Sequence, residues 1–474
     1  MSKMLLNRAD MALVPDKVLY EYGAKDADAT YRILKPQLER LKEASLLSYY
    51  ENFIIPLSKN LLKSSLIGIK IDRKKKNKTD QYLTKVIESY REEMEEEYAY
   101  EGFNPNSPNQ VSELLFDDFK LPVVKETTAG GRSTDEEVLE ILFEKTQHPF
   151  VSILREYRKL TKLKSTYIDP LEILMDEKGY IHPNWRVSGA RTGRVTSQDP
   201  GTTTVPRDKT YKVKGEEIPL SLRSIYSCPP GHEVGYYDKR QGELRCMAIF
   251  AGDEALLSVL KSGRDPHNES ARECLDYGKD EEIPDEVRVI AKAINFGLIY
   301  GASDEGLAAN TGAEIEKVRE FIARHKRTFP DLHEFINNIA DVAFEAGHLE
   351  SAFGRRKHVV PVARGDKRAY SHQKREFINF LPQNTCAEIT AGEFNRICDK
   401  FRKYPEFGAK AWPFNLVYDS VQIAFKKEYR KQVEEIIREE ALKPVPEMNN
   451  WVFPIKLGFG GNWSDAEQNA ESVG

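Results

Sequence analysis

Four residues with chemically useful side chains are spaced by four positions in the segment from 288 to 301. Arg288, Lys292, Phe296 and Tyr300 would form one stripe along a helix that begins near Pro284. The two cations lie in its N-terminal half, where they oppose the helix dipole unless an anion binds there. Such a helix end suits a triphosphate, and the two aromatic faces suit a base or a sugar. The alternative interpretation is an ordinary amphipathic helix with solvated cations.

Two aspartates follow segments with strand character. Asp238 ends the predicted strand 233–237, and Asp419 lies at the tip of a predicted hairpin over residues 414–425. Carboxylates at the ends of two adjacent strands can bridge two Mg²⁺ ions about 3.5–4 Å apart, the arrangement for in-line phosphoryl transfer. An aspartate at a strand end can instead be a turn or cap residue.

The remaining sequence must position these groups. The chain has 474 residues, of which 40% are hydrophobic and 31% charged, and this length corresponds to about three domains of roughly 150 residues. The pattern is helical to about residue 175, β-rich over 180–245, helical over 285–345, and β-rich again around 414–425. This order predicts an α+β fold with one sheet assembled from distant segments.

Charge and cysteine content restrict the partners and the compartment. Because the net charge is −5, any site for a polyanion must be a local basic surface. Two basic runs, within 59–78 and 155–164, suggest such a surface, although solvated charged faces are the alternative. The five scattered cysteines favour a reducing cytosol, and no segment resembles a signal peptide or a membrane span.

The order of these motifs resembles family A DNA polymerases, the group of bacterial DNA polymerase I and many phage replicases. Residues 238–245, DKRQGELR, resemble the family's first palm motif, DYSQIELR, and residues 417–420, VYDS, resemble its last palm motif, VHDE. The stripe from Arg288 to Gly301 matches the fingers-helix motif at every defining position. Further collinear similarities lie at residues 155–167, 191–197, 263–267, 375–383 and 461–463.

The resemblance implies a right hand of thumb, palm and fingers with an antiparallel palm sheet. We expect a helical C-terminal remnant of an exonuclease domain at 1–50, the thumb at 51–175, the first part of the palm at 176–260, the fingers at 261–385 and the second part of the palm at 386–474. The implied activity is DNA-templated DNA synthesis by two-metal phosphoryl transfer, with primer-template DNA and dNTPs as partners. The implied cofactor is Mg²⁺, as two ions, with Mn²⁺ as a possible substitute.

The resemblance also assigns site residues. The implied catalytic residues are Asp238, Asp419 and Lys292, and the implied metal ligands are Asp238, Asp419 and the backbone carbonyl of Lys239. The incoming dNTP would contact Arg288, Lys292, Phe296, Tyr300, His267, Gln241 and Glu243, with Glu243 as a steric gate against ribose. DNA would contact Thr192, Arg194, Arg375, Asn379, Gln383, Lys162 and Lys164.

Several positions depart from the family pattern. Ser420 replaces an acid, so we expect slower or more Mn²⁺-dependent activity, with the hydroxyl still able to orient water. Residues 201–206, GTTTVP, replace NLQNIP, and Asn384 replaces a glycine. Lys239 and Arg240 add cations beside the metal site that could bind phosphate. A catalytically weakened primer-template-binding protein is therefore a rival, as is a single-subunit RNA polymerase, although Glu243 and the segment 295–297 argue against the latter.

The N-terminal stretch resembles only one part of a 3′–5′ exonuclease domain. Residues 22–26, YGAKD, resemble its third motif, and the first two motifs are absent, so we expect no proofreading by this chain alone. A separate exonuclease polypeptide could dock on residues 1–50, or the segment could be truncated or a relic that packs on the palm. The implied location is the cytoplasm of a bacterium or a phage-infected host.

Overall fold

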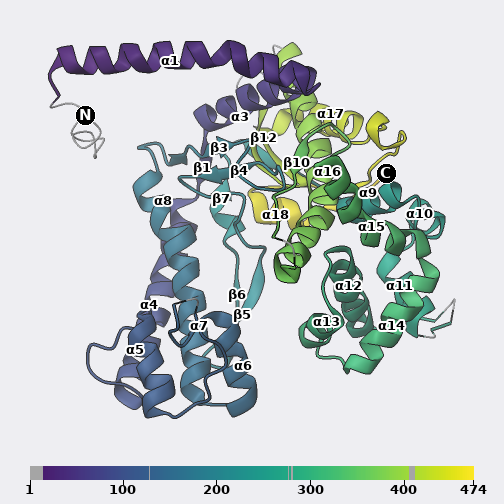
Figure 1. Cartoon of the computed structure of the whole chain (residues 1–474). Coiled ribbons are helices and arrows are strands. Elements are labelled where there is room, and N and C mark those ends of the chain that lie inside the picture. The colour runs from purple at the N-terminus through teal and green to yellow at the C-terminus, as the bar shows by residue number, and fades with distance from the viewer. Residues whose placement is uncertain (1–13, 128, 276, 279–280, 364, 405–410) are drawn as a thin grey trace.

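The computed structural model describes residues 14–127, 129–275, 277–278, 281–363, 365–404 and 411–474. Two helical lobes extend from a central lobe that contains the main sheet (Figure 1). We name them the thumb lobe, the palm lobe and the fingers lobe, in line with the expected fold. The α+β prediction is confirmed, since helices predominate to residue 174 and again over 242–346, with most of the strands between and after them.

The palm sheet has five strands in the order β11-β12-β8-β13-β14, and every neighbouring pair is antiparallel. The strands come from three distant segments: β8 (His232–Lys239), β11 (Ala411–Val417), β12 (Ser420–Lys426), β13 (Ile455–Gly460) and β14 (Glu471–Val473). The predicted hairpin is β11 and β12, and every residue of β11 is buried. The central place of β8 puts the end of this strand beside the hairpin tip.

Helices cover the palm sheet. The long helix α16 (Lys367–Lys403) packs against β11, α9 (Gly242–Ala251) and α17 (Arg430–Ala441), while α18 (Trp463–Gln468) packs against β13 and β8. Helices α9 and α16 approach so closely that a Cβ on Gly242 would lie 2.4 Å from Sγ of Cys386. Glycine is therefore required at this point of the DKRQGELR segment.

The thumb lobe is a helical column. It contains α4 (Arg73–Glu97), α5 (Pro108–Ser112), η3 (Glu113–Asp118), α6 (Glu136–Thr146), α7 (Pro149–Leu163), η4 (Lys164–Ile168) and α8 (Asp169–Leu174). Asp72 caps α4 by accepting hydrogen bonds from the backbone N–H groups of Lys74 and Lys75, both 3.0 Å. The hairpin of β5 (Lys209–Val213) and β6 (Glu216–Leu220) also packs on the thumb, because Tyr211 belongs to the same buried core as α4 and α7.

Short strands and turns connect the lobes. One small sheet joins β1 (Ile69–Ile71) to β2 (Tyr180–Ile181) and β7 (Tyr226–Ser227), and another pairs β3 (Asn184–Arg186) with β4 (Thr196–Gln198). The 3₁₀ turns are η5 (Arg223–Ile225), η6 (Lys427–Tyr429) and η7 (Pro446–Met448).

The fingers lobe consists of helices around two small hydrophobic cores. Its elements are α10 (Glu254–Lys261), α11 (Pro266–Leu275), α12 (Asp285–Ile299), α13 (Asp304–Thr311), α14 (Ile315–Thr328), α15 (Pro330–Ala346), β9 (His348–Glu350) and β10 (Arg356–His358). The predicted stripe helix is α12, and Tyr300 is its C-terminal cap residue.

The N-terminal segment forms α1 (Asp16–Glu43), α2 (Leu47–Tyr49), η2 (Tyr50–Ile54) and α3 (Ile55–Ile67), while residues 1–13 lie outside the described residues. Helix α1 has no fully buried residue, whereas Tyr49, in the short helix that follows it, donates a hydrogen bond to Glu388 of α16. Leu57 and Leu61 of α3 belong to a palm core, although the sequence placed them in the thumb. In the part of the chain that the structure describes, no helix is long and apolar enough to cross a membrane.

Candidate active site

The structure brings Asp238 and Asp419 together at one edge of the palm sheet. Asp238 lies opposite Ser420 in the ladder between β8 and β12, and the backbone N–H of Lys239 donates a 3.0 Å hydrogen bond to the carbonyl of Asp419. Tyr418, with a φ of 55°, forms the tight turn that precedes Asp419. Burial and the negative charge of Asp238 raise the pKa of Asp419 to about 7, and burial also raises the pKa of Asp238. A cation would relieve this repulsion.

The carboxylate pair fits divalent cations that keep part of their water shell. Among the described residues, no group of three or more Asp, Glu, His or Cys side chains is arranged to hold a metal ion. The remaining ligands would therefore be water, substrate phosphate or a backbone carbonyl, as is common for Mg²⁺.

The side chain of Lys239 does not add a cation to this site. Its ammonium group is fully buried, lies 2.5 Å from the carboxylate of Glu393, and donates a 2.8 Å hydrogen bond to the carbonyl of Ala441. The expectation that it binds phosphate is wrong, because successive side chains of a strand point to opposite faces and that of Lys239 points into the core.

The hydroxyl of Ser420 forms hydrogen bonds within the hairpin of β11 and β12. Its hydroxyl donates a 3.1 Å hydrogen bond to the carbonyl of Val417 and accepts one of 3.2 Å from Gln422. The hydroxyl proton is therefore not free to orient water at the carboxylate pair, contrary to our expectation from sequence.

Two charged residues that the sequence did not identify lie beside Asp238. The guanidinium of Arg207 is 3.5 Å from the carboxylate of Asp238 and 3.2 Å from that of Glu467 on α18. Glu467 also accepts a 2.5 Å hydrogen bond from the buried Arg223. In the sequence, only their positions mark these two residues. Arg207 follows the segment 201–206 and Glu467 follows the segment 461–463, both of which we compared with the family pattern.

Helix α12 presents the predicted stripe as one surface. The rings of Phe296 and Tyr300 stack with their centroids 6.0 Å apart, and the ammonium of Lys292 is 5.9 Å from the Phe296 ring. Lys292 is exposed and, among the residues that the structure describes, pairs with no carboxylate. Arg288 donates hydrogen bonds of 3.1 and 2.6 Å to Asp265. Burial alone would raise the pKa of Asp265, but the bonds from Arg288 and the His267 backbone lower it overall.

His267 lies behind this stripe on α11. Its ring centroid is 5.4 Å from that of Phe296, and Nδ1 accepts a 3.1 Å hydrogen bond from Asn295. Burial, aided by Arg288 and Lys292, lowers the pKa of His267 to about 4, so the ring is neutral at physiological pH. Only 2% of the residue is exposed, and the expected contact of its ring with phosphate stays a prediction.

Glu243 connects the fingers lobe with the carboxylate pair. Its carboxylate accepts hydrogen bonds from the phenol of Tyr300 and from the guanidinium of Arg194. Its negative charge also contributes to the raised pKa of Asp419. Gln241, with a φ of 51°, begins the same helix and is half-buried. These contacts place α12 and the two aspartates around one site.

Three of the residues expected to contact DNA lie on α16. Arg375, Asn379 and Gln383 follow one face of α16, and Arg375 is exposed. Asn384, which replaces a glycine of the family pattern, donates a 3.0 Å hydrogen bond to the carbonyl of Thr192. Within the described residues, Oδ1 of Asn379 and Oδ1 of Asn384 are buried and meet no hydrogen-bond partner.

Of the two thumb lysines expected to contact DNA, Lys164 is already paired with carboxylates. Lys164 lies 3.0 Å from Asp80 and 2.5 Å from Asp169, and hydrogen bonds to these carboxylates raise its pKa although burial opposes them. Lys76, in the other basic run, is buried against Asp80 and Glu172. Lys162 is exposed. The two runs are therefore partly internal ion-pair networks.

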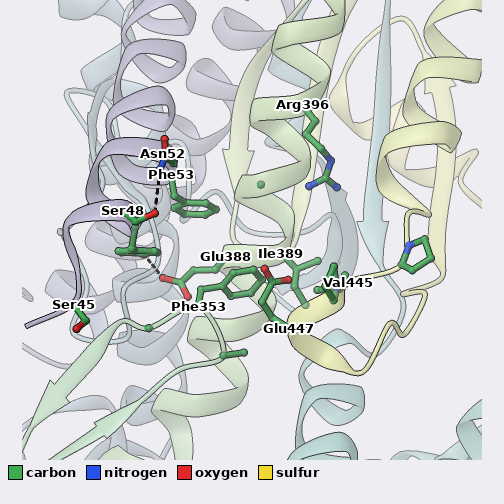
Figure 2. A pocket seen from close by; sticks show the side chains of 16 residues that line it. Ser45, Ser48, Asn52, Phe53, Phe353, Glu388, Ile389, Arg396, Val445 and Glu447 are labelled. Atoms are coloured by element: carbon green, nitrogen blue, oxygen red, sulfur yellow. Dashed lines mark hydrogen bonds between the residues drawn. The ribbon is translucent and has the colours of Figure 1, made fainter.

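A separate pocket lies away from this site, between residues 45–53, which follow α1, the helix α16 and residues 444–447. It has a volume of about 550 Å³, and Phe53, Phe353, Glu388 and Arg396 line it (Figure 2). No residue predicted from the sequence for catalysis or DNA contact lines this pocket.

The three lobes and the carboxylate pair beside α12 define a right-hand polymerase. The profile of DNA polymerase family A matches residues 73–465, and the chain belongs to this family. DNA polymerase I of Caldicellulosiruptor bescii is 32% identical over 423 residues, covering 88% of this chain and 47% of that protein. The thermostable DNA polymerase I of Thermus thermophilus is 31% identical over 473 residues, covering 96% of this chain and 54% of that protein.

The solved structures show the same fold. The POL domain of Pol1 from M. smegmatis, in complex with DNA primer-template and dNTP, has a TM-score of 0.79 at 24% identity, covering 91% of this chain and 73% of that chain. The chain spans about half the length of the curated relatives described above.

Proposed function

We propose that this chain is a DNA-templated DNA polymerase that adds dNTPs to a primer 3′ end. The observation that carries this proposal is the position of Glu243, whose charge acts on Asp419 while its carboxylate accepts a hydrogen bond from Tyr300 of the fingers lobe. The nucleotide-binding stripe and the carboxylate pair therefore share one site. The relatives named DNA polymerase I and the neighbour bound to primer-template and dNTP support this proposal.

In this proposal the protein mainly positions charge. Two Mg²⁺ ions, when bound, would make the primer hydroxyl a better nucleophile and stabilise the leaving pyrophosphate. Asp238 and Asp419 would hold them, together with the backbone carbonyl of Lys239. Lys292 and Arg288 would neutralise the triphosphate, for which Arg288 must leave Asp265.

The remaining residues would select the nucleotide. Phe296 would pack near the sugar and Tyr300 near the templating base. Glu243 would occupy the space that a ribose 2′-hydroxyl needs, with Gln241 at the start of the same helix. Thr192, Arg194, Arg375, Asn379 and Gln383 would contact the new base pair and the nearby DNA, and Lys162 and Lys164 the duplex along the thumb.

Primer extension on a defined template tests the proposal. With four dNTPs and Mg²⁺, the proposed polymerase extends the primer, and with four rNTPs it does not. Binding without extension in either Mg²⁺ or Mn²⁺ would identify the weakened primer-template-binding protein. Efficient extension with rNTPs would identify the RNA polymerase. Since Ser420 adds no negative charge, we expect faster extension in Mn²⁺ than in Mg²⁺.

The absence of proofreading belongs to this proposal. Tyr22 and Asp26, the two residues of the exonuclease-like motif, lie on α1. Incubation with a 3′-mismatched primer and no dNTP should leave the primer intact, and shortening of the primer would contradict the proposal. Docking of a separate exonuclease polypeptide on residues 1–50, and a cytoplasmic location, remain predictions from the sequence that the comparisons do not support specifically.

A further inference from the structure

Helix α1 makes few contacts with the rest of the described chain, and along it only Leu19, Leu38 and Leu41 are half-buried. It lies along one edge of the molecule, and its N-terminal end is separate from the three lobes (Figure 1). None of its 28 residues is buried. Tyr20, Tyr31 and Leu34 are exposed by 68%, 77% and 52%. Large apolar side chains that are exposed on a helix indicate an interaction surface.

Seven of the apolar and small residues of α1 follow a heptad repeat, while Val18, Leu19, Tyr22 and Ile33 lie outside it. Their spacings alternate between four and three, and we call these residues the seam: Tyr20, Ala24, Ala27, Tyr31, Leu34, Leu38 and Leu41. This spacing is typical of a two-stranded coiled coil. Pro36 lies on the opposite side of the helix, where its missing N–H does not disturb the seam. The length of the seam, about three heptads, suits a second helix of similar length.

The charges beside the seam are arranged for a second copy of the same helix. Glu21 and Asp28 flank its N-terminal half, and Lys35 and Lys42 flank the same side of its C-terminal half. An antiparallel second copy places Glu21 opposite Lys42 and Asp28 opposite Lys35, and a two-fold axis repeats both pairs. A parallel pair would instead bring Glu21 next to an acid, Asp16.

The sizes of the seam residues agree with the same alignment. Ala24 would face Leu41, Ala27 would face Leu38, and Tyr31 would face Leu34, so that each small residue meets a large one. Tyr20 of the second copy would lie level with Ser45, which lines the pocket beside α16 (Figure 2). Phe53 and Phe353 line this pocket and could receive an aromatic ring.

Within its own helix, Glu21 lies 2.6 Å from Lys25, and Asp28 lies 2.8 Å from Arg32. Both pairs are exposed, so their exchange for contacts across an interface costs little. We propose that α1 is a dimerisation helix that binds α1 of a second copy of this chain, antiparallel, through the seam. The proposal is independent of the polymerase activity, because no site residue lies on α1.

Charge reversal tests the proposal in the full chain. By sedimentation velocity over a concentration series, the wild type should approach twice its 54.3 kDa. Glu21→Lys/Asp28→Lys and Lys35→Glu/Lys42→Glu should each be monomeric, because every flanking pair becomes repulsive. A mixture of the two variants should restore the dimer, since only the mixed pair is complementary. Glu39→Lys/Arg40→Glu, which exchanges charges away from the seam, should behave like the wild type.

A crosslinking experiment fixes the orientation and does not depend on the charged variants. Chains carrying Ala24→Cys and chains carrying Leu41→Cys should form a disulfide-linked heterodimer when mixed and oxidised, and neither chain should do so alone. Crosslinking of Ala24→Cys with itself would indicate a parallel pair and overturn the proposed alignment. A wild type that remains monomeric at every concentration would overturn the proposal as a whole. This is also the result expected if a different polypeptide covers the seam. Primer extension by the same samples keeps either failure distinct from a failure of the polymerase proposal.

Discussion

The phenol of Tyr300, at the end of α12, donates a hydrogen bond to the carboxylate of Glu243 on α9. This contact joins the fingers lobe to the palm lobe beside the two aspartates. Because burial and Glu243 both disfavour ionisation of the phenol, they raise the pKa of Tyr300 well above its usual value, so it remains a donor. The carboxylate therefore has a fixed position in the site.

Removing this carboxylate should relax the selection against ribonucleotides. In Glu243→Ala, the space for a 2′-hydroxyl opens, and we expect the ratio of kcat/KM for rNTP over dNTP to rise by about 10- to 200-fold. Single-nucleotide incorporation measures this ratio. Tyr300→Phe is the matched control, because it removes the hydrogen bond and keeps the carboxylate. An unchanged ratio in Glu243→Ala would show that the steric-gate assignment is wrong.

Lys292 should matter for the chemical step more than for folding. Its ammonium is exposed on α12 beside Phe296, and replacing it by alanine removes a charge that would stabilise the triphosphate in the transition state. Lys292→Ala should lower kcat by about 100- to 1,000-fold, with an unchanged thermal unfolding midpoint. Lys317→Ala, at an exposed fingers position, should change neither quantity. A loss of kcat below about threefold would remove Lys292 from the site.

Arg207 should weaken the binding of divalent cations to the free enzyme. It lies 3.5 Å from the carboxylate of Asp238, and its removal leaves that carboxylate more attractive to a cation. We expect Arg207→Ala to bind Mn²⁺ about fivefold more tightly, since Arg207 is largely exposed and the charge of a solvent-screened side chain contributes about 1 kcal/mol. Electron paramagnetic resonance of free Mn²⁺ measures this affinity, with Lys212→Ala as the control. Weaker binding in Arg207→Ala would contradict the electrostatic interpretation.

His267 should contribute no ionisation near neutral pH. Burial lowers its pKa to about 4, so it is already neutral at pH 6 and stays neutral as the pH rises to 8. Because kcat/KM reports the ionisations of the free enzyme, the wild type and His267→Gln should have pH profiles of the same shape between pH 6 and 8. An inflection that disappears only in the variant would mean that His267 titrates in this range.

Local patterns in the sequence predicted the parts of the site that depend on local geometry. The spacing of four residues placed Arg288, Lys292 and Phe296 on one face of α12, because helix periodicity fixes that relation. The apolar arms around Asp419 predicted the hairpin of β11 and β12 for a similar reason.

Contacts between distant segments were not accessible in this way. The burial of Lys239 against Glu393 depends on how α16 packs on the sheet, and the position of Arg207 beside Asp238 and Glu467 depends on three separate segments. The same limit explains why α3 was assigned to the thumb, since its sequence does not show that Leu57 and Leu61 face the palm.

The most direct test of the central claim compares the wild type with Asp419→Ala on one labelled primer-template. We measure primer extension with Mg²⁺ and four dNTPs, and duplex binding by fluorescence anisotropy in the same buffer. The wild type should extend the primer, while Asp419→Ala should show no extension and a Kd within about threefold of the wild-type value, because the lost carboxylate would contact metal and not DNA. Extension by Asp419→Ala at the wild-type rate would contradict the claim that Asp238 and Asp419 form the catalytic centre.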